Sequence, residues 1–301
     1  MVIVITGPTG TGKTKLGLFL AKKLNGEIIN ADSTQIYKGL DIATNKEKNT
    51  EGITHHLFDF LDIKKDYTVY DYQKDCRDCI DDILKRGKVP ILVGGTGLYI
   101  KAALYDYEFS EKENNDYEGF SNEQLYQKLL KVDPNTDIHL NNRKRVISAL
   151  NYYEANKTPY SEKKKSDKLL YDTLFIGLTA NRNILYEKIN KRVDEMVLNG
   201  LLEEAKDIYD SNIRTKAVMT PIGYKELFDY FDGNKELFEC IDLIKQKSRR
   251  YAKRQYTWFK NQMILQWFTT NYDNFSETEN EVLNYIKKFI KKGTYYESCF
   301  F

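Results

Sequence analysis

The feature that most constrains this chain is a glycine-rich segment close to its N-terminus. Residues 7–14 read Gly-Pro-Thr-Gly-Thr-Gly-Lys-Thr, which matches G-x-x-x-x-G-K-[S/T] at every position. A β-branched run, Val2–Ile5, precedes it, and leucines at helical spacing follow it (Leu16, Leu20, Leu24). A strand, a glycine loop and a helix in this order form a phosphate-binding loop, in which backbone N–H groups and a helix N-terminus face an anion. The segment therefore predicts a polyphosphate ligand and an α/β fold.

Each residue type of this loop has a role in binding phosphate. Glycines let the backbone approach the anion, Lys13 reaches an outer phosphate, and the hydroxyl of Thr14 is a ligand for Mg²⁺, the expected cofactor. The alternative is a glycine-rich turn that binds nothing. The candidate phosphate-binding residues are Gly7, Pro8, Thr9, Gly10, Thr11, Gly12, Lys13 and Thr14.

Strands and helices alternate along much of the chain. We expect strands at 27–30, 89–93, 174–179 and 264–268, and an amphipathic helix at 70–85. Strands that alternate with helices indicate a parallel sheet joined by crossovers. The fold class is therefore α/β, with a P-loop NTPase-like parallel sheet as its core.

The alternation stops between the strands at 89–93 and 174–179. Residues 106–123 are acidic, and two helices are expected at 122–132 and 142–155. We predict that 1–104 form the first part of the core and that 105–170 form a mainly helical insertion domain. Residues 171–301 then complete the core and add a basic, helical C-terminal part.

Composition excludes several classes of protein. With 301 residues, 41% of them hydrophobic, the chain can bury one large core or two modest ones. Its net charge of +2 is not that of a strongly basic protein. The apolar runs are too short for a transmembrane helix, and no secretory signal is visible. We expect a cytoplasmic protein that does not contact a membrane.

The four cysteines do not form a disulfide framework. Cys76 and Cys79 have the spacing of a zinc-ligand pair, but a zinc site needs two more ligands. We expect both side chains to pack as small apolar groups on a helix.

Parts that a P-loop hydrolase needs are missing. The strand at 89–93 is followed by Gly94-Gly95-Thr96, without the acid that would hold Mg²⁺, and no N-K-x-D sequence for guanine occurs. An acid follows the preceding strand instead, at Asp32. The carboxyl ends of parallel strands meet at one edge, so we expect Asp32 and Thr96 beside the phosphate loop. Asp32 can accept a proton there, or it can simply cap the next turn.

Several motifs together resemble the tRNA dimethylallyltransferase family, also called tRNA isopentenyltransferases or IPP transferases. The phosphate loop alone is generic, but the stretch from Asp32, Gly94–Tyr99 and Ile222–Glu226 are specific in combination. The matching segments, in family order, are Gly7–Thr14, Ala31-Asp32-Ser33 with Gln35 and Tyr37, Leu40-Asp41-Ile42, His55-His56-Leu57, Gly94–Tyr99, Val132-Asp133-Pro134, Arg182, Arg192-Val193 with Met196, Gly200-Leu201, Ile222–Glu226, and Tyr251–Gln255 with Trp258.

The resemblance implies a reaction that does not consume ATP. A dimethylallyl group passes from dimethylallyl diphosphate to N6 of the adenosine at tRNA position 37, next to the anticodon. The phosphate loop would hold the diphosphate, whose charge Lys13, Thr14 and Mg²⁺ would neutralise. Asp32 would take the proton from the amine, with Thr96 beside the reacting centre. Arg182 and Arg192 are candidates for a second diphosphate clamp, unless they are ordinary helix surface charges.

The resemblance also implies a pocket for a base that has left its stack.

The basic segment 245–260 has seven cations and no acid. One of its faces can follow an RNA backbone or simply be solvated. The expected partners are the anticodon stem-loop of tRNA and dimethylallyl diphosphate, and the expected state is a monomer. The implied tRNA-binding residues are Asp32, Ser33, Thr34, Gln35, Thr96, Thr220, Gly223, Tyr224, Lys225, Lys247, Arg250 and Arg254.

The chain departs from the family pattern in places. Residues 43–47 read Ala-Thr-Asn-Lys-Glu where the family usually has Gly-Thr-Ala-Lys-Pro, and Ser148 replaces a usual arginine. The tRNA contacts that family members make at these positions are therefore not expected in this chain. Two other functions stay open: a P-loop kinase for a small molecule or nucleotide, and an RNA-binding module without catalysis.

Overall fold

The structure is a computed structural model that describes residues 1–47, 49–109, 117–163 and 168–292. The chain divides into two compact units, one formed by Met1–Leu104 with the residues from Leu169 onwards, the other by Tyr105–Lys168. Part of the acidic stretch expected between 106 and 123 lies outside the described residues. In the described part of the chain, no helix is long and apolar enough to cross a membrane.

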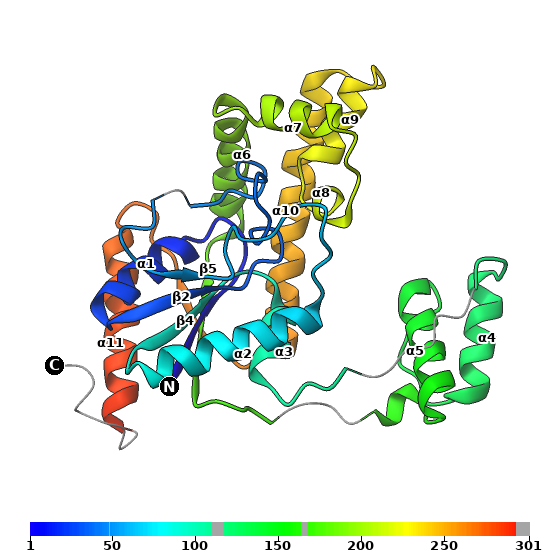
Figure 1. The fold of residues 1–301 in the computed structure, drawn as a ribbon, viewed down its shortest axis with the longest axis horizontal. Helices are drawn as coiled ribbons and strands as arrows, with labels where there is room; N and C mark the ends of the chain where they lie inside the picture. Colours follow the sequence, from blue (N-terminus) through cyan, green and yellow to red (C-terminus); the bar gives the residue numbers. More distant parts are fainter. Residues whose placement is uncertain (48, 110–116, 164–167, 293–301) are drawn as a thin grey trace. The chain divides into compact units, whose positions relative to one another are not determined.

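The first unit is built on a parallel sheet (Figure 1). Its strands lie in the order β3-β2-β4-β1-β5-β6, and each strand runs parallel to its neighbours. The predicted α/β class with a parallel sheet is confirmed. The strands are β1 (Val2–Thr6), β2 (Gly26–Asn30), β3 (His55–His56), β4 (Val89–Val93), β5 (Thr173–Thr179) and β6 (Gln266–Thr269).

The central strand, β1, is buried at every residue. A strand covered on both faces shows a continuous apolar run, which is why Val2–Ile5 could be recognised in the sequence. Strand β3 is not among the strands expected from the sequence. It pairs with Ile28 and Ile29 of β2, but it is too short to have a period.

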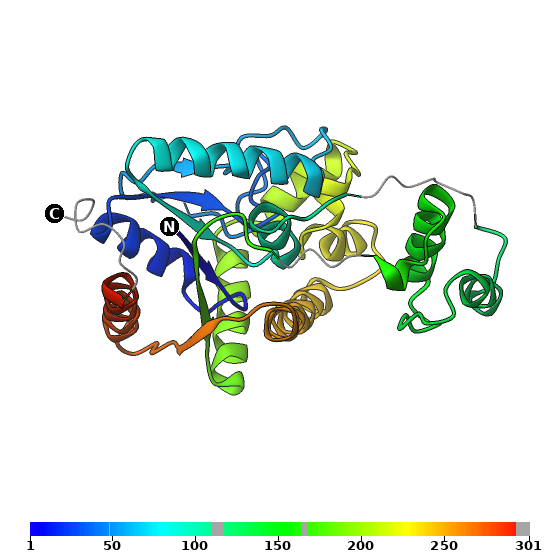
Figure 2. The same ribbon diagram turned by 90° about the horizontal axis from the view of Figure 1, so that it is seen from below.

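Helices cover both faces of the sheet. Helix α1 (Lys13–Lys23) packs on β1, β2 and β4 and contacts α11 (Phe275–Lys292). Helix α2 (Val69–Lys85) contacts β2 and β4 and packs against α3 (Gly97–Leu104). Figure 2 shows α1 and α2 on opposite faces, as expected for parallel strands joined by helical crossovers.

A second apolar cluster lies in the helical part that follows β5. It is formed by α6 (Arg182–Leu198), α7 (Leu201–Asp210), α8 (Lys216–Met219), α9 (Tyr224–Phe231) and α10 (Leu237–Gln262). Ile36 and Leu40, from the loop after β2, are buried in the same cluster. The helical part therefore holds one of the loops that follow the sheet.

The unit Tyr105–Lys168 has a small core of its own. Helices α4 (Asn122–Val132) and α5 (Arg143–Asn156) were both predicted, and a short 3-10 helix, η1 (Tyr160–Glu162), follows them. Leu125 and Leu129 pack against Val146 and Leu150. Ser121 caps α4 through a reciprocal capping box with Gln124.

Candidate functional site

The candidate site begins where β1, β2 and β4 end. These strands are neighbours, and Val93 of β4 is in register with both Ile5 and Asn30. The segments that follow them are joined directly, because Thr96 N–H donates to the carbonyl of Ala31 at 3.0 Å. Thr96 Oγ1 also accepts from the N–H of Ser33 at 3.0 Å. The expected meeting of Thr96 with the Asp32 segment is observed.

The phosphate loop is shaped by its own residues. Gly12 has φ of 85° and begins α1 without a side-chain cap, so the first N–H groups of the helix are open to an anion. Thr11 Oγ1 donates to Pro8 O at 2.9 Å, and Lys13 Nζ donates to the same carbonyl at 2.8 Å. Burial lowers the pKa of Lys13 to about 8; Asp32 opposes this shift and Arg192 adds to it.

Two hollows adjoin this loop. The first, here called the loop cavity, has a volume of about 300 Å³, and Lys13, Thr14 and Asn30 are among its lining residues. The second, here called the helix cavity, has a volume of about 410 Å³ and is lined by residues of α6 and α10 and by Thr220. The residues that line both cavities are Thr9, Asp32, Thr44 and Arg192. Asp32 therefore faces the space beside the phosphate loop on one side and a second space on the other.

The walls of the helix cavity differ in chemistry. Ser33, Thr34 and Thr96 contribute hydroxyl groups beside Asp32. Other parts of the wall are apolar, formed by Ile189, Val193, Met196 and Ile222. The cavity can therefore accept a flat group that has polar edges and an apolar face.

Asp32 is held in a local turn. Its Oδ1 accepts from the N–H of Thr34 at 3.0 Å and from Thr34 Oγ1 at 2.7 Å. The N–H of Asp32 donates to Asn30 Oδ1 at 2.9 Å. The turn-capping role considered for Asp32 is thus observed, and the same residue also lines both cavities. The two roles are compatible, since these carboxylate contacts use one oxygen.

Helix α10 holds the phosphate loop from outside through Gln255. This side chain is 5% exposed. Its Oε1 accepts from the N–H of Thr9 at 2.8 Å, and its Nε2 donates to Gly95 O at 3.1 Å. A Cβ atom on Gly95 would lie 2.1 Å from that Nε2. Gly95 therefore leaves the space that the Gln255 amide occupies. Gln255 belongs to a segment that matches the family pattern, but nothing in the sequence indicates this contact.

Tyr251 stands one turn before Gln255 and lines the helix cavity. Burial, together with the charge of Asp32, raises the pKa of Tyr251. Ile244, seven residues earlier on α10, is buried, whereas Tyr251 faces the cavity.

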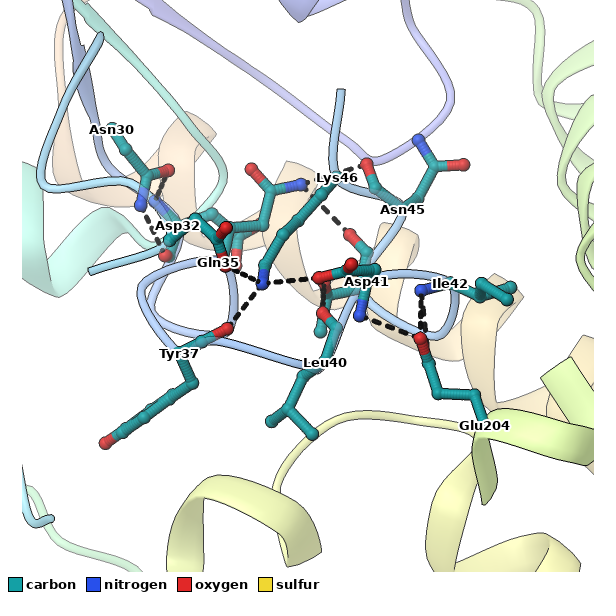
Figure 3. A network of polar contacts seen from close by, with 12 residues as sticks. Asn30, Asp32, Gln35, Tyr37, Leu40, Asp41, Ile42, Asn45, Lys46 and Glu204 are labelled. Atoms are coloured by element: carbon teal, nitrogen blue, oxygen red, sulfur yellow. Dashed lines mark hydrogen bonds and ion pairs between the residues drawn. The ribbon is translucent and has the colours of Figure 1, made fainter. Parts of the chain in front are cut away.

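A second loop, residues 40–47, is held by a carboxylate that sequence reasoning missed. Glu204 of α7 accepts from the backbone N–H groups of Asp41 (2.9 Å), Ile42 (2.8 Å) and Ala43 (3.1 Å). It also accepts from the hydroxyl of Tyr224 at 2.7 Å. Figure 3 shows this carboxylate beside Ile42. An acid in the first turn of a helix is ordinary, so the sequence carried no signal for this contact.

The same loop is joined to the segment that starts at Asp32. Gln35 Nε2 donates to Thr44 O at 2.9 Å and to Asn45 O at 3.2 Å. Lys46 Nζ lies 2.8 Å from Asp41 Oδ1 and also donates to the carbonyl of Tyr37 (Figure 3). The amide nitrogen of Gln35, an implied tRNA contact, is thus engaged within the protein.

Comparisons with known proteins agree with this geometry. Residues 35–262, more than half of the chain, match the family model described as IPP transferase. The chain belongs to the IPP transferase family. A tRNA dimethylallyltransferase from Anoxybacillus flavithermus is 49% identical over 298 residues, which cover 95% of this chain and 96% of the relative. One from Bacillus subtilis is 47% identical over 282 residues, covering 89% and 90%.

Solved IPP transferase structures share the fold. A tRNA isopentenylpyrophosphate transferase from Staphylococcus epidermidis has a TM-score of 0.72 at 40% identity, covering 95% of this chain and 98% of that one. A eukaryotic dimethylallyltransferase acting on tRNA has a TM-score of 0.83 at 32% identity, covering 97% and 79%.

The two arginines expected from the family pattern lie in different places. Arg192 lines both cavities, and its Nη1 donates to Thr9 Oγ1 at 2.7 Å. Burial lowers its pKa, and Asp32 opposes this shift. Arg182 is exposed, and its Nε donates to the hydroxyl of Tyr186 at 3.1 Å. Of the two candidates for a diphosphate clamp, the structure brings only Arg192 to the cavities.

The implied tRNA-binding residues of the IPP transferase family also separate into groups. Thr220 and Arg254 are exposed and line the helix cavity, and Arg250 and Lys225 are exposed. Lys247 instead lies 2.8 Å from Glu226, a carboxylate that is fully buried. The Glu226 carboxylate also accepts from the N–H of Gly223 at 2.7 Å. Tyr224 is fully buried, so its side chain supports the loop with Glu204, and it is not among the residues that line the loop cavity or the helix cavity.

The cysteine pair is compatible with the packing role. Cys76 is fully buried, and burial raises its pKa to about 12; burial likewise raises the pKa of Cys79 to about 11. Within the ranges that the structure describes, no three His, Cys, Asp or Glu residues are grouped to hold a metal ion.

Proposed function

We propose that this chain transfers a dimethylallyl group from dimethylallyl diphosphate to N6 of the adenosine at position 37 of tRNA. One observation carries the proposal. Asp32 lines both the loop cavity, which contains the phosphate-binding residues, and the helix cavity, which has polar groups and an apolar wall. A donor in the first and a base in the second would meet at this carboxylate.

The reaction forms one bond and breaks another. N6 of the adenine attacks C1 of the dimethylallyl group, and the bond between C1 and the diphosphate oxygen breaks. The proton that leaves N6 passes to the Asp32 carboxylate, acting as a general base. Thr96 and Tyr251, which both line the helix cavity, would form the polar wall around the reacting amine.

The diphosphate leaves with additional negative charge, which the loop cavity can stabilise. The open N–H groups at the start of α1, Lys13 and Arg192 face that space. Magnesium commonly binds through few protein oxygens together with substrate phosphates and water. Thr14 supplies one hydroxyl oxygen in the loop cavity, so the donor set fits this arrangement. Mg²⁺ held by Thr14 and the diphosphate would supply further charge neutralisation.

On the acceptor side, the proposed partner is the anticodon stem-loop. The target base must leave its stack to reach a cavity of this kind. Ser33, Thr34 and Thr220 would contact the base, and Arg254 would contact the backbone. We also propose that the protein acts as a monomer in the cytoplasm, in the compartment that holds tRNA.

The kinase alternative is disfavoured by the comparisons, since the relatives described above are transferases that act on tRNA. An assay without ATP separates the two functions. Labelled dimethylallyl diphosphate, Mg²⁺ and unmodified tRNA are mixed with wild type, Asp32→Asn, and the exposed control Asp62→Asn. Asn keeps an Oδ1 acceptor for Thr34 and removes only the charge.

We expect wild type and Asp62→Asn to label tRNA at equal rates. Loss of a general base should slow Asp32→Asn by roughly 10²- to 10⁴-fold. No label on tRNA from folded wild type would refute the transferase, and phosphorylation of an acceptor with ATP as the donor would then support the kinase.

A further inference from the structure

A third hollow adjoins the helix cavity and has no role in the mechanism above. Its volume is about 210 Å³. Tyr37, Tyr67 and Tyr99 contribute to its wall, with Leu98 and Lys216. We call it the tyrosine pocket. It shares Ser33, Thr34 and Thr220 with the helix cavity, so an occupant of one lies next to an occupant of the other.

The tyrosine rings are fixed by contacts behind the pocket. Tyr67 donates its hydroxyl proton to Asp75 Oδ2 at 2.8 Å, and Tyr37 is buried. The ring of Tyr99 stacks on Tyr72 with centroids 4.2 Å apart. A wall that is already ordered loses little conformational entropy when a ligand binds.

The chemistry of the pocket fits a nucleotide. Aromatic rings and aliphatic side chains provide surfaces for the face of a base, and hydroxyl groups can bond to its edge. Leu98, 43% exposed, and Lys216, also exposed, contribute an apolar contact and a cation. The residues that line the pocket include no acid, so the phosphate of an RNA backbone is not repelled.

We propose that the tyrosine pocket binds the base of a nucleotide adjacent to the target adenosine. Extruding one base removes a stacking partner from each neighbour, and the pocket offers one neighbour a new partner. This inference rests on the proposed function, because the helix cavity must hold the target base. It makes the pocket a second point of recognition for the RNA sequence.

The test is a double-mutant cycle on RNA binding. Anticodon stem-loops that are intact, abasic on the 5′ side of the target, or abasic on the 3′ side are titrated into wild type, Leu98→Ala and Ile264→Ala. Ile264 is 96% exposed and lines none of the three hollows, so it controls for loss of an exposed aliphatic side chain. Thermal unfolding verifies that each variant is folded.

We expect one of the two abasic RNAs to bind wild type about 5- to 100-fold more weakly, the range for losing one stacked base. In Leu98→Ala, the same abasic change should cost several-fold less, whereas the other abasic change should cost the same as in wild type. Ile264→Ala should behave as wild type. Additive effects of Leu98→Ala with both abasic RNAs would overturn the proposal.

A second pair of variants separates stacking from folding. Tyr67→Phe loses the hydrogen bond to Asp75 but keeps the ring, whereas Tyr67→Leu loses both. We expect the Phe variant to bind intact RNA like wild type and the Leu variant to bind it several-fold more weakly. Equal binding by both variants would contradict a stacking role. These binding experiments can be read even if no transfer occurs, so their failure is distinct from failure of the proposed function.

Discussion

The phosphate loop (residues 7–14) and the loop at residues 40–47 both border the loop cavity, but they acquire their shapes differently. The first is shaped by its glycines, by internal bonds such as Thr11 to Pro8, and by the helix that it begins. The second depends on Glu204, more than 150 residues away in the chain, whose carboxylate accepts from three of its backbone N–H groups. One loop is therefore specified locally, and the other takes its shape from the tertiary fold.

Removing the charge of the locally specified loop should have the largest effect. Lys13→Ala deletes the amine that we propose to face the leaving diphosphate and leaves the glycines in place. Loss of one group that stabilises developing charge costs about 10²- to 10³-fold in kcat. Single-turnover transfer with saturating donor measures this effect. A loss below tenfold would show that Arg192 and the backbone N–H groups suffice.

Removing the remote support should have an intermediate effect. Glu204→Ala leaves three backbone N–H groups without an acceptor, at about 1–3 kcal/mol each if they remain buried. We expect the KM for tRNA to rise and kcat to fall, with the affinity for inorganic diphosphate unchanged, because the phosphate loop keeps its own bonds.

Tyr224→Phe is the matched control for this change. It removes one donor to Glu204 and leaves the carboxylate in contact with the loop, so its effect on the KM for tRNA should be smaller. Equal effects of Glu204→Ala on tRNA and on diphosphate binding would show that the two loops are not independent.

This difference also explains how far the sequence could be interpreted. Strands β1 and β4 and helices α2, α4 and α5 have strong local patterns, and each was predicted within one or two residues of its observed bounds. The meeting of Asp32 with Thr96 followed from parallel topology. The contacts of Gln255 and Glu204 could not be predicted, because each depends on where a distant helix packs. Strand β3 was not predicted for a different reason, because two residues are too few to show a hydrophobic alternation.

The pH dependence of diphosphate binding tests the phosphate loop separately from the loop at residues 40–47. The pKa of Lys13 is lowered by burial to about 8, so its amine is charged below that pH and loses its proton above it. Affinity for diphosphate should therefore fall as pH rises, by about tenfold between pH 7 and pH 9 for one titrating cation. Calorimetry measures it. Lys13→Arg stays charged and reports the titration of the ligand itself, so the same pH dependence in both proteins would contradict the prediction.

The smallest effect concerns two cations of α10. Lys247 is paired with the buried Glu226, whereas Arg254 is exposed at the helix cavity. Arg254→Ala should reduce the salt dependence of tRNA binding by about 0.7–0.9 in the slope of log K against log salt concentration, the value for one phosphate contact. Lys247→Ala should leave that slope unchanged and lower the free energy of unfolding, because it leaves a buried carboxylate without its cation. The reverse pattern would assign the RNA contact to Lys247.

The bond from Thr9 to Gln255 has a consequence for synthesis of the chain on the ribosome. Its partners are 246 residues apart, so a nascent chain carries the phosphate loop long before it carries the helix that completes the site. The central strand also waits for β5, which begins at Thr173. Until then one edge of β1 has no neighbour, and unpaired edges favour association with other chains. The site of this enzyme can therefore form only late in synthesis of the chain. A chain that stops before α10 cannot assemble it.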